Sequence, residues 1–384
     1  MIAEILFGYL PLAIWLYLLV GRDWFWQMNE RDTLAEPPPP KNWPSVVAVV
    51  PARNEADVIR ASIGSLLAQD YQGELRVILV DDQSDDGTGD LARALNSERL
   101  IVLKDAPRPP GWTGKLWAME QGVRHAATFN PEFLWLTDAD IAHSPDNLSR
   151  LVARAESGGK VLVSLMARLS CRTAAEHFLV PAFVFFFDML FPFAAVNDPA
   201  RPIAAAAGGC MLARRSALDA AGGIDGIRHN IIDDCALARV MKAEGPIWLG
   251  LTDRAVSLRP YERLSEIRQM VSRSAYAQLD YSPLLLAATL AGLVIVYIAP
   301  VMTALFTWDV SQLAGWLAWL IMALMFQPIL RFYRLSPLWG IALPVIGAFY
   351  AGFTLDSAIQ YWSGKGGMWK GRAQAGQNIG SGKA

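Results

Sequence analysis

The stretch SVVAVVPARNEAD, residues 45–57, decides the fold class: an apolar, β-branched run passes directly into a polar turn. Such a run predicts a buried strand, and residues 56–70 (ADVIRASIGSLLAQD) then show the periodicity of an amphipathic helix. The alternation continues with predicted strands at 75–80, 100–104 and 132–137 and predicted helices at 91–96 and 115–127. Strands that alternate with helices in this way predict an α/β fold built from βαβ units.

Polar side chains follow several of these predicted strands. They are Asn54 and Glu55 after the first, Asp81 and Asp82 after the second, and Asp138 and Asp140 after the fourth. In open α/β sheets, ligands bind outside the carboxyl ends of the strands, so these residues are candidates for one binding site. No GxGxxG joins the first strand to its helix, which argues against a dinucleotide dehydrogenase.

The two aspartates in FLWLTDADIAHSP (residues 133–145) predict a metal site. Asp138 and Asp140 are one residue apart, and like charges that close repel unless a cation lies between them. Hard oxygen ligands favour Mg²⁺ or Mn²⁺, which complete their shells with water and substrate phosphates. The alternative is a solvated loop in which Ser144 caps the next helix.

Composition and hydropathy predict a membrane protein. The chain has 384 residues, 53% of them hydrophobic, and a net charge of −2, so nothing global argues for a nucleic-acid partner. Three widely separated cysteines indicate a reducing compartment without a structural zinc site. Apolar runs occupy both ends: residues 5–20, 284–306, 313–330 and 338–355. We interpret the first as an uncleaved anchor and the others as transmembrane helices.

These runs define the predicted domains. They are an N-terminal transmembrane anchor (1–22), a Pro-rich linker (23–44), a globular domain (45–282), a C-terminal transmembrane region (283–355) and a basic tail (356–384). Residues 177–196 are also apolar, but a span there would put Asp138 and Asp140 on one side of the membrane and a second acidic pair, Asp233 and Asp234, on the other. We therefore expect residues 177–196 to be an interfacial segment.

The charges of the loops predict the orientation. The loop TWDVS (307–311) has no Lys or Arg, whereas the next loop contains Arg331 and Arg334, which places the globular domain in the cytoplasm. Four full spans would put the basic tail outside. We therefore expect the last apolar run to be re-entrant or interfacial, returning the tail to the cytoplasmic face.

Six motifs carry a specific resemblance. VVPARNE, VDDQSDDGT, GWTGKLWAMEQG, LTDAD, AAAAGGCML and IIDDCALA occur in the order found in family 2 glycosyltransferases of the GT-A fold. The chain resembles the ceramide-glucosyltransferase-like branch, and its sequence is similar to those of the bacterial hopene-associated glycosyltransferases over nearly its whole length. The resemblance implies an NDP-sugar donor, a UDP-sugar being favoured, Mg²⁺ or Mn²⁺, and inversion at the anomeric carbon. It also implies a hopanoid or other lipid acceptor in the bacterial inner membrane.

The resemblance assigns roles on the donor side of the site. Asp82 resembles the carboxylate that holds the base or ribose, with Asn54 and Glu55 alongside and Asp81 able to share that role. Lys115 starts a helix in a Gly-rich turn, where a cation and free backbone N–H groups can both meet a diphosphate. Asp138 and Asp140 then bring the metal onto that diphosphate.

The acceptor side is assigned to a second acidic pair, Asp233 and Asp234, at the start of a predicted helix. By the family pattern Asp234 is the general base and Asp233 orients it, whereas the alternative is an acidic first turn favoured by the helix dipole. The chain departs from the family's Gln-x-x-Arg-Trp motif, because Gln269 and Arg273 are one residue farther apart and no tryptophan follows. Arg273 remains a candidate for the diphosphate, and the missing tryptophan favours transfer of a single sugar.

Other functions stay open at this stage. A polyprenyl phosphate acceptor is already ionised and needs no base, and ceramide-like or carotenoid lipids are further acceptors. The alternative outside enzymes is a membrane scaffold that retains a nucleotide-binding fold.

Overall fold

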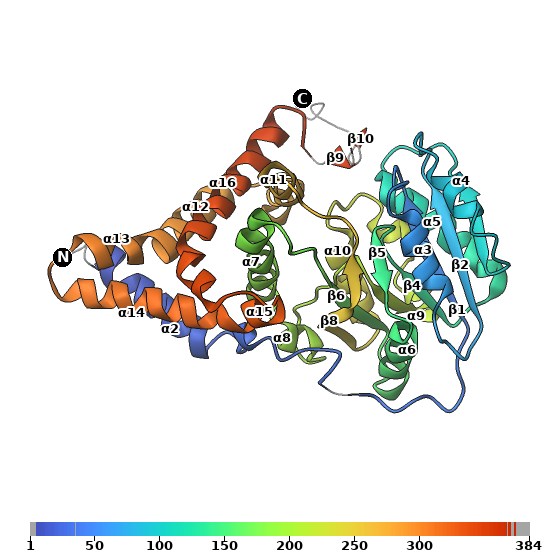
Figure 1. Cartoon of the computed structure of the whole chain (residues 1–384), viewed down its shortest axis with the longest axis horizontal. Coiled ribbons are helices and arrows are strands. Elements are labelled where there is room, and N and C mark those ends of the chain that lie inside the picture. Colours follow the sequence, from blue (N-terminus) through green and yellow to red (C-terminus); the bar gives the residue numbers. More distant parts are fainter. Residues whose placement is uncertain (1–4, 35, 367, 370–371, 374–384) are drawn as a thin grey trace, which may run out of the picture. The chain divides into compact units, whose positions relative to one another are not determined.

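The computed structural model describes residues 5–34, 36–366, 368–369 and 372–373 (Figure 1). The chain forms two compact units, and it passes between them repeatedly. A helical unit combines residues 1–29, 171–194 and 261–366, and an α/β unit combines residues 30–170, 195–260 and 367–384.

The α/β unit is built on a mixed sheet, in which eight strands are found among the described residues. They are β1 (Val46–Ala52), β2 (Leu75–Asp81), β3 (Leu100–Lys104), β4 (Phe133–Leu136), β5 (Ile141–His143), β6 (Leu162–Arg168), β7 (Met211–Arg214) and β8 (Ile247–Ser257), in the order β3-β2-β1-β4-β7-β6-β8-β5. The first four strands of that order are parallel, as βαβ units require. β7 runs antiparallel to both β4 and β6, and β5 runs antiparallel to β8. The predicted α/β fold is confirmed.

Helices connect these strands. They are α3 (Ile59–Leu67), α4 (Thr88–Arg93), α5 (Gly114–Ala126), α6 (Asn147–Ser157), α9 (Arg215–Ala220) and α10 (Asp233–Glu244), with 3-10 turns at Ala127–Phe129 and Asp225–Ile227. The helix predicted at 91–96 begins three residues earlier, because the chain leaves a left-handed Gly87 straight into α4. A short helix α8 (Phe193–Asn197) lies where the chain passes from the helical unit to the α/β unit.

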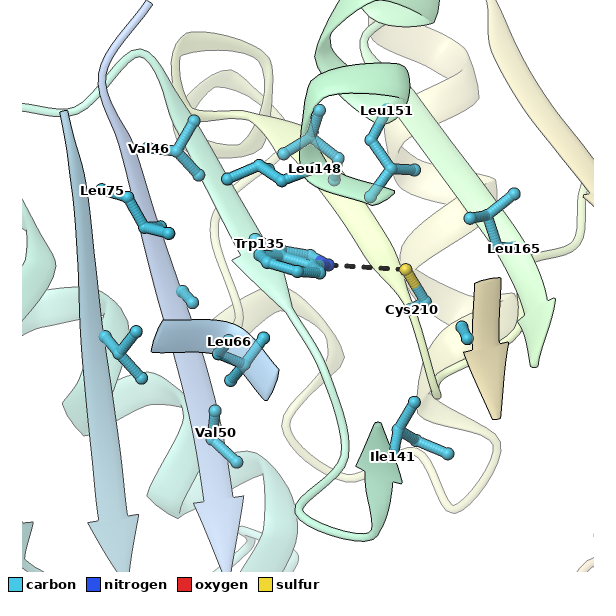
Figure 2. Close-up of a cluster of buried hydrophobic side chains, with 14 of the residues drawn as sticks. Val46, Val50, Leu66, Leu75, Trp135, Ile141, Leu148, Leu151, Leu165 and Cys210 are labelled. Carbon is cyan, nitrogen blue, oxygen red and sulfur yellow. Dashed lines mark hydrogen bonds between the residues drawn. The ribbon is translucent and has the colours of Figure 1, made fainter. Parts of the chain in front are cut away.

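The hydrophobic core of the α/β unit is formed by buried side chains of the sheet and of the helices packed on it. All seven side chains of β1 are buried, which explains why this strand appears in the sequence as a continuous apolar run rather than an alternating one. Figure 2 shows Trp135 of β4 at the centre of the cluster, where its indole N–H donates to Cys210 Sγ at 3.4 Å. Trp135 is fully buried, and Leu66 of α3 and Leu148 of α6 belong to the same cluster.

The helical unit contains the apolar ends of the chain. Its elements are a π-turn (Ile5–Tyr9), α2 (Leu10–Val20), α7 (Ala174–Leu190), α11 (Leu264–Ser272), α12 (Pro283–Leu293), a π-helical turn (Val294–Ile298), α13 (Ala299–Phe306), α14 (Val310–Met325), α15 (Gln327–Phe332), a 3-10 helix (Pro337–Ala342), α16 (Leu343–Trp362) and 3-10 turns at Phe25–Gln27 and Ala277–Leu279. Within the described part of the chain, three helical stretches are long and apolar enough to cross a membrane: Pro283–Phe306, Val310–Phe332 and Pro337–Trp362. The apolar helix at the N-terminus, Phe7–Val20, is shorter.

Close contacts hold α2, α13 and α14 together, and Figure 1 shows these three helices side by side. The hydroxyl of Thr303 donates to the Phe7 carbonyl at 2.8 Å, and the indole of Trp15 donates to the Val296 carbonyl at 2.8 Å. A Cβ at Gly315 would lie 2.7 Å from the Pro300 carbonyl oxygen, so α13 and α14 approach closely only with glycine there. Beyond α16, the strands β9 (Met368–Trp369) and β10 (Arg372–Ala373) pair with each other, and residues 367, 370–371 and 374–384 of the predicted basic tail lie outside the described residues.

Candidate active site

Lys115 lies at the centre of the candidate site in the α/β unit. It stands in the first turn of α5, which begins at Gly114 because the Thr113 hydroxyl accepts the Leu116 N–H and caps the helix. Its Nζ lies 2.8 Å from Asp138 Oδ1 and 3.0 Å from Asp233 Oδ2. The two acidic pairs, which are far apart in the sequence, therefore meet at one ammonium group.

The charge on Lys115 is stabilised by its neighbours. Burial alone would lower the pKa of this lysine, but the carboxylates of Asp138 and Asp233 outweigh it and hold the pKa above its usual value. Lys115 therefore stays an ammonium ion, available to an anionic ligand, across the whole physiological range.

Asp138 and Asp140 follow β4 with partly exposed side chains, 34% and 24% exposed. Burial raises the pKa of Asp138 and the nearby charge of Asp140 adds to it, while Lys115 opposes the shift. Among the described residues, no group of three His, Cys, Asp or Glu side chains could hold a metal ion. Two carboxylates fit a Mg²⁺ or Mn²⁺ ion whose remaining ligands are water and phosphate oxygens, and do not fit a closed structural site.

Asp234 is held rigidly at the start of α10. Its Oδ2 accepts the backbone N–H of Gly208 at 3.0 Å, and its Oδ1 accepts the backbone N–H of Cys235 at 2.8 Å. Burial, and next the charge of Asp233, raise the pKa of Asp234 to about 6, against the lowering effect of Lys115. Asp234 is therefore ionised at neutral pH yet close to the pKa at which a carboxylate accepts a proton readily.

Gly208 completes this side of the site, and the sequence did not single it out for a role. A Cβ at this position would lie 3.3 Å from Lys115 Nζ and 3.5 Å from Asp234 Oδ2. The backbone thus approaches the charged groups closely, and its N–H is one of the two donors to Asp234. The Gly-Gly pair after an alanine run, in AAAAGGCML, was the available signal.

A hydrogen-bonded series of buried polar groups lies next to the site. Asn147 Nδ2 lies 3.0 Å from His143 Nδ1, His143 Nε2 lies 2.9 Å from Thr137 Oγ1, and the Thr137 hydroxyl donates to the Gly209 carbonyl at 2.8 Å. Burial lowers the pKa of His143 to about 3, so the ring is neutral and the network assigns its proton to Nε2. Because Thr137 precedes Asp138 and Gly209 follows Gly208, this hydrogen-bonded series holds the backbone beside both of them.

The residues predicted to bind the base or ribose lie in two loops that are hydrogen-bonded to each other. The Asn54 N–H donates to Ser84 Oγ at 3.0 Å, and the Asp85 N–H donates to Asn54 Oδ1 at 3.1 Å. Asp81 Oδ1 accepts the Ser84 N–H at 3.0 Å, so this carboxylate holds the second loop in place. Asp82 is buried at the end of β2, 1% exposed.

Arg259 is a further site residue that the sequence did not indicate. Its guanidinium forms an ion pair with Glu55 and lies 3.4 Å, through Nε, from Asp140 Oδ2. The antiparallel pairing of Ile141 with Ser257 brings it there, because residue 259 follows β8 directly. Arg273, by contrast, belongs to the helical unit, where it follows α11 and is exposed, so its role stays a prediction.

Residues 47–222 match the model of the family Glycosyl transferase family 2. This region of the chain is similar to glycosyl transferase family 2 domains. The match covers just under half of the chain and lies mostly within the α/β unit.

Two curated relatives resemble parts of this chain. One is the succinoglycan biosynthesis protein ExoO of Rhizobium meliloti (strain 1021), 34% identical over 126 residues that cover 32% of this chain and 33% of the relative. Another is the undecaprenyl-phosphate mannosyltransferase of Micrococcus luteus, 32% identical over 125 residues that cover 31% of this chain and 47% of the relative. The match thus spans between a third and a half of these relatives' length.

A solved structure shares the fold. It is a mannosyltransferase from Pyrobaculum calidifontis in complex with GDP-mannose and Mn²⁺, and it has a TM-score of 0.55 at 20% identity, covering 93% of this chain and 100% of that one. The predicted GT-A fold of the α/β unit is confirmed, together with three apolar C-terminal helices that could span a membrane.

Proposed function

We propose that this protein is an inverting glycosyltransferase that moves one sugar from a nucleoside diphosphate sugar to a membrane lipid. The observation that carries the proposal is the convergence of both acidic pairs on Lys115. An ammonium group and the start of α5 form an anion site, with one carboxylate pair available to a metal and the other to a proton.

The donor's diphosphate binds at Lys115 and at the backbone N–H groups that open α5. Asp138 and Asp140 would hold a divalent cation, which supplies positive charge against the charge that develops on the leaving nucleoside diphosphate. The loops that carry Asn54 and Asp82 take the nucleoside. The Pyrobaculum mannosyltransferase was captured with GDP-mannose and Mn²⁺, and we propose the same two kinds of ligand for this chain, with a UDP-sugar as the favoured donor.

Asp234 acts as general base. As the acceptor oxygen forms its bond to the anomeric carbon and the bond to the diphosphate breaks, Asp234 takes the acceptor's hydroxyl proton. Its pKa of about 6 suits this task, because the group is ionised at pH 7 and still accepts a proton. Asp233, which pairs with Lys115, orients Asp234, and Arg273 is a further candidate for the diphosphate.

The acceptor we propose is a hopanoid hydroxyl, on the strength of the sequence motifs shared with the hopene-associated enzymes. The second candidate is a polyprenyl phosphate, which the name of the Micrococcus luteus relative favours. A phosphate acceptor is already ionised and needs no base, so the paired backbone donors and raised pKa of Asp234 support the hydroxyl acceptor.

We further propose that the protein lies in the bacterial inner membrane with its α/β unit in the cytoplasm. Two stretches, Pro283–Phe306 and Val310–Phe332, would cross as a hairpin whose outer loop contains no Lys or Arg. The basic residues Arg331 and Arg334 lie at the inner end of that hairpin.

The contacts of α16 support a re-entrant path for the last apolar run. A third full crossing would bring Trp362 to the side of Phe306. Instead, the ring of Trp362 lies 5.7 Å from that of Tyr276, and the ring of Tyr361 stacks on that of Tyr281 at 4.4 Å. Tyr276 and Tyr281 both precede the first spanning helix. The tail would then leave the membrane on the side where that helix begins.

Fusion of a reporter to the full-length chain tests this orientation. A C-terminal green fluorescent protein should fluoresce and a C-terminal alkaline phosphatase should be inactive. Trp308, 90% exposed between the two crossing stretches, provides the opposite control, since Trp308→Cys should react with an impermeant maleimide added outside. An active phosphatase at the C-terminus would refute the re-entrant path.

Lipid glycosylation itself is tested with the purified full-length protein. Incubation with a bacterial lipid extract, Mn²⁺ and a panel of labelled UDP- and GDP-sugars should yield one labelled lipid, which mass analysis assigns to the hopanoid or the polyprenol class. Asp140→Ala should abolish it. Nucleotide binding that does not depend on metal, with no labelled lipid from any donor, would instead indicate a non-enzymatic scaffold.

A further inference from the structure

Arg259 links the two loops of the candidate site that carry Glu55 and Asp140. The guanidinium pairs with Glu55, which is 8% exposed, and its Nε lies 3.4 Å from Asp140 Oδ2. Asp140 is one of the two carboxylates proposed to hold the divalent cation. An arginine therefore already neutralises part of the charge that the cation would neutralise.

The backbone holds Arg259 at this place while leaving its side chain accessible. The Leu258 N–H donates to the Asp140 carbonyl at 2.8 Å, and the Arg259 N–H donates to Ser257 Oγ at 3.3 Å. The first bond extends the β5–β8 pairing by one step and fixes Leu258 beside Asp140, so the next residue, Arg259, is held close to Asp140. The Arg259 side chain is 37% exposed, so a ligand can reach the guanidinium.

We propose that Arg259 is a donor-binding residue that exchanges partners when the donor binds. Without ligand it holds Asp140, and when the metal and the nucleoside diphosphate arrive it releases Asp140 to the metal and binds the diphosphate. A planar guanidinium suits this exchange, because it pairs with carboxylates and with phosphates in the same two-pronged geometry. Glu55 remains its partner in both states. The inference rests on the proposed function, since it requires a metal-diphosphate ligand at this site.

The exchange predicts effects of opposite sign on two affinities. Removing the guanidinium frees Asp140 from a competing cation, so Mn²⁺ alone should bind more tightly. It also removes a diphosphate ligand, so a nucleoside diphosphate should bind more weakly in the presence of Mn²⁺. If Arg259 only supported the structure, its substitution would weaken both affinities or change neither.

The test uses the full-length protein in detergent, with Mn²⁺ affinity from electron paramagnetic resonance and UDP and GDP affinity from calorimetry at saturating Mn²⁺. In Arg259→Gln we expect Mn²⁺ alone to bind several-fold more tightly and the better nucleotide to bind about tenfold more weakly, as for the loss of one charge-assisted hydrogen-bonded pair. Arg259→Lys keeps the charge without the fork, so it should leave Mn²⁺ affinity near wild type and give an intermediate nucleotide affinity.

Arg254, which lies in β8 five residues before Arg259, provides a matched control. It also bridges two carboxylates, with Nη1 3.1 Å from Asp32 Oδ2 and Nε 3.0 Å from Asp146 Oδ2, neither of which is a proposed ligand. Arg254→Gln should change neither affinity. Melting temperatures of all three variants show whether each is folded.

The outcomes separate the two proposals. Wild-type protein that binds neither Mn²⁺ nor nucleotide would overturn the proposed function and this inference with it. Wild-type binding of both, with Arg259→Gln and Arg259→Lys lowering both affinities or changing neither, would overturn the partner exchange alone.

Discussion

The general base is the most demanding part of the proposed mechanism, and Asp234→Asn tests it directly. The substitution keeps the size of the side chain and replaces one carboxylate oxygen by an NH₂ group, so one of the two bonds from the Gly208 and Cys235 N–H groups is lost. Burial disfavours the charged form of Asp234, which partly offsets that loss. We therefore expect a small change in melting temperature and a large loss of activity, about 10²- to 10⁴-fold as for other general bases.

The pH dependence gives a second measure of the same group. The pKa of Asp234 is raised to about 6, so the ionised base is present above that pH and is lost as the pH falls through it. Wild-type activity at pH 5 should be about a tenth of its value at pH 8. Because the charge of Asp233 contributes to the raised pKa, Asp233→Asn should move this acid limb to lower pH.

The assay is the initial rate of lipid labelling at saturating donor, measured from pH 4.5 to 8.5 for wild type, Asp233→Asn and Asp234→Asn. Asp253→Asn is the control, since Asp253 is exposed on β8 and its ion pair with Arg168, at 2.8 Å, lies outside the proposed site. If Asp234→Asn kept activity within about tenfold of wild type, the base role would be wrong and a phosphate acceptor would be favoured.

Three further predictions follow from the site. Lys115→Met leaves the two carboxylates that face the ammonium without their counter-charge, so nucleotide affinity by calorimetry should fall at least about tenfold and the melting temperature should fall as well. Gly208→Ala places a Cβ 3.3 Å from Lys115 Nζ and should lower the rate of transfer without lowering the melting temperature, whereas the control Gly64→Ala, with nothing within 4 Å of the new Cβ, should keep full activity. For His143 the pKa is lowered from 6.5 to about 3, so the unfolded chain takes up the proton first and stability should fall as the pH drops below 6.5, by about 1.4 kcal/mol per pH unit; melting curves at pH 7 and pH 5 should show a smaller drop for His143→Gln.

The local parts of the fold were predictable from the sequence. The run at Val46–Ala52 is buried on both faces, and such a run differs clearly from the amphipathic helix that follows it. The polar residues that follow β1, β2 and β4 were also predictable, because parallel strands bring their carboxyl ends to one edge of the sheet. The position of Asp233 and Asp234 at a helix start is confirmed by α10.

The missing parts of the site depend on contacts between distant segments. Arg259 reaches Asp140 only because β5, a strand of three residues, pairs antiparallel with the end of β8. Hydrophobic periodicity describes a single segment and carries no information about which segment lies beside it. Gly208 was missed for a related reason, since its close approach to Lys115 depends on where the loop before β7 is held.

The repeated passage of the chain between the two units limits how this protein can be divided. Residues 171–194 lie inside the stretch that matches the family model, yet they belong to the helical unit. There the Leu179 carbonyl accepts the Tyr350 hydroxyl at 2.9 Å, and Phe185 is fully buried. A fragment cut before residue 261 would keep α7 but lose the helices that cover it. The apolar C-terminal helices are thus not an independent appendage, because removing them would expose α7, a helix that lies inside the stretch matching the family model.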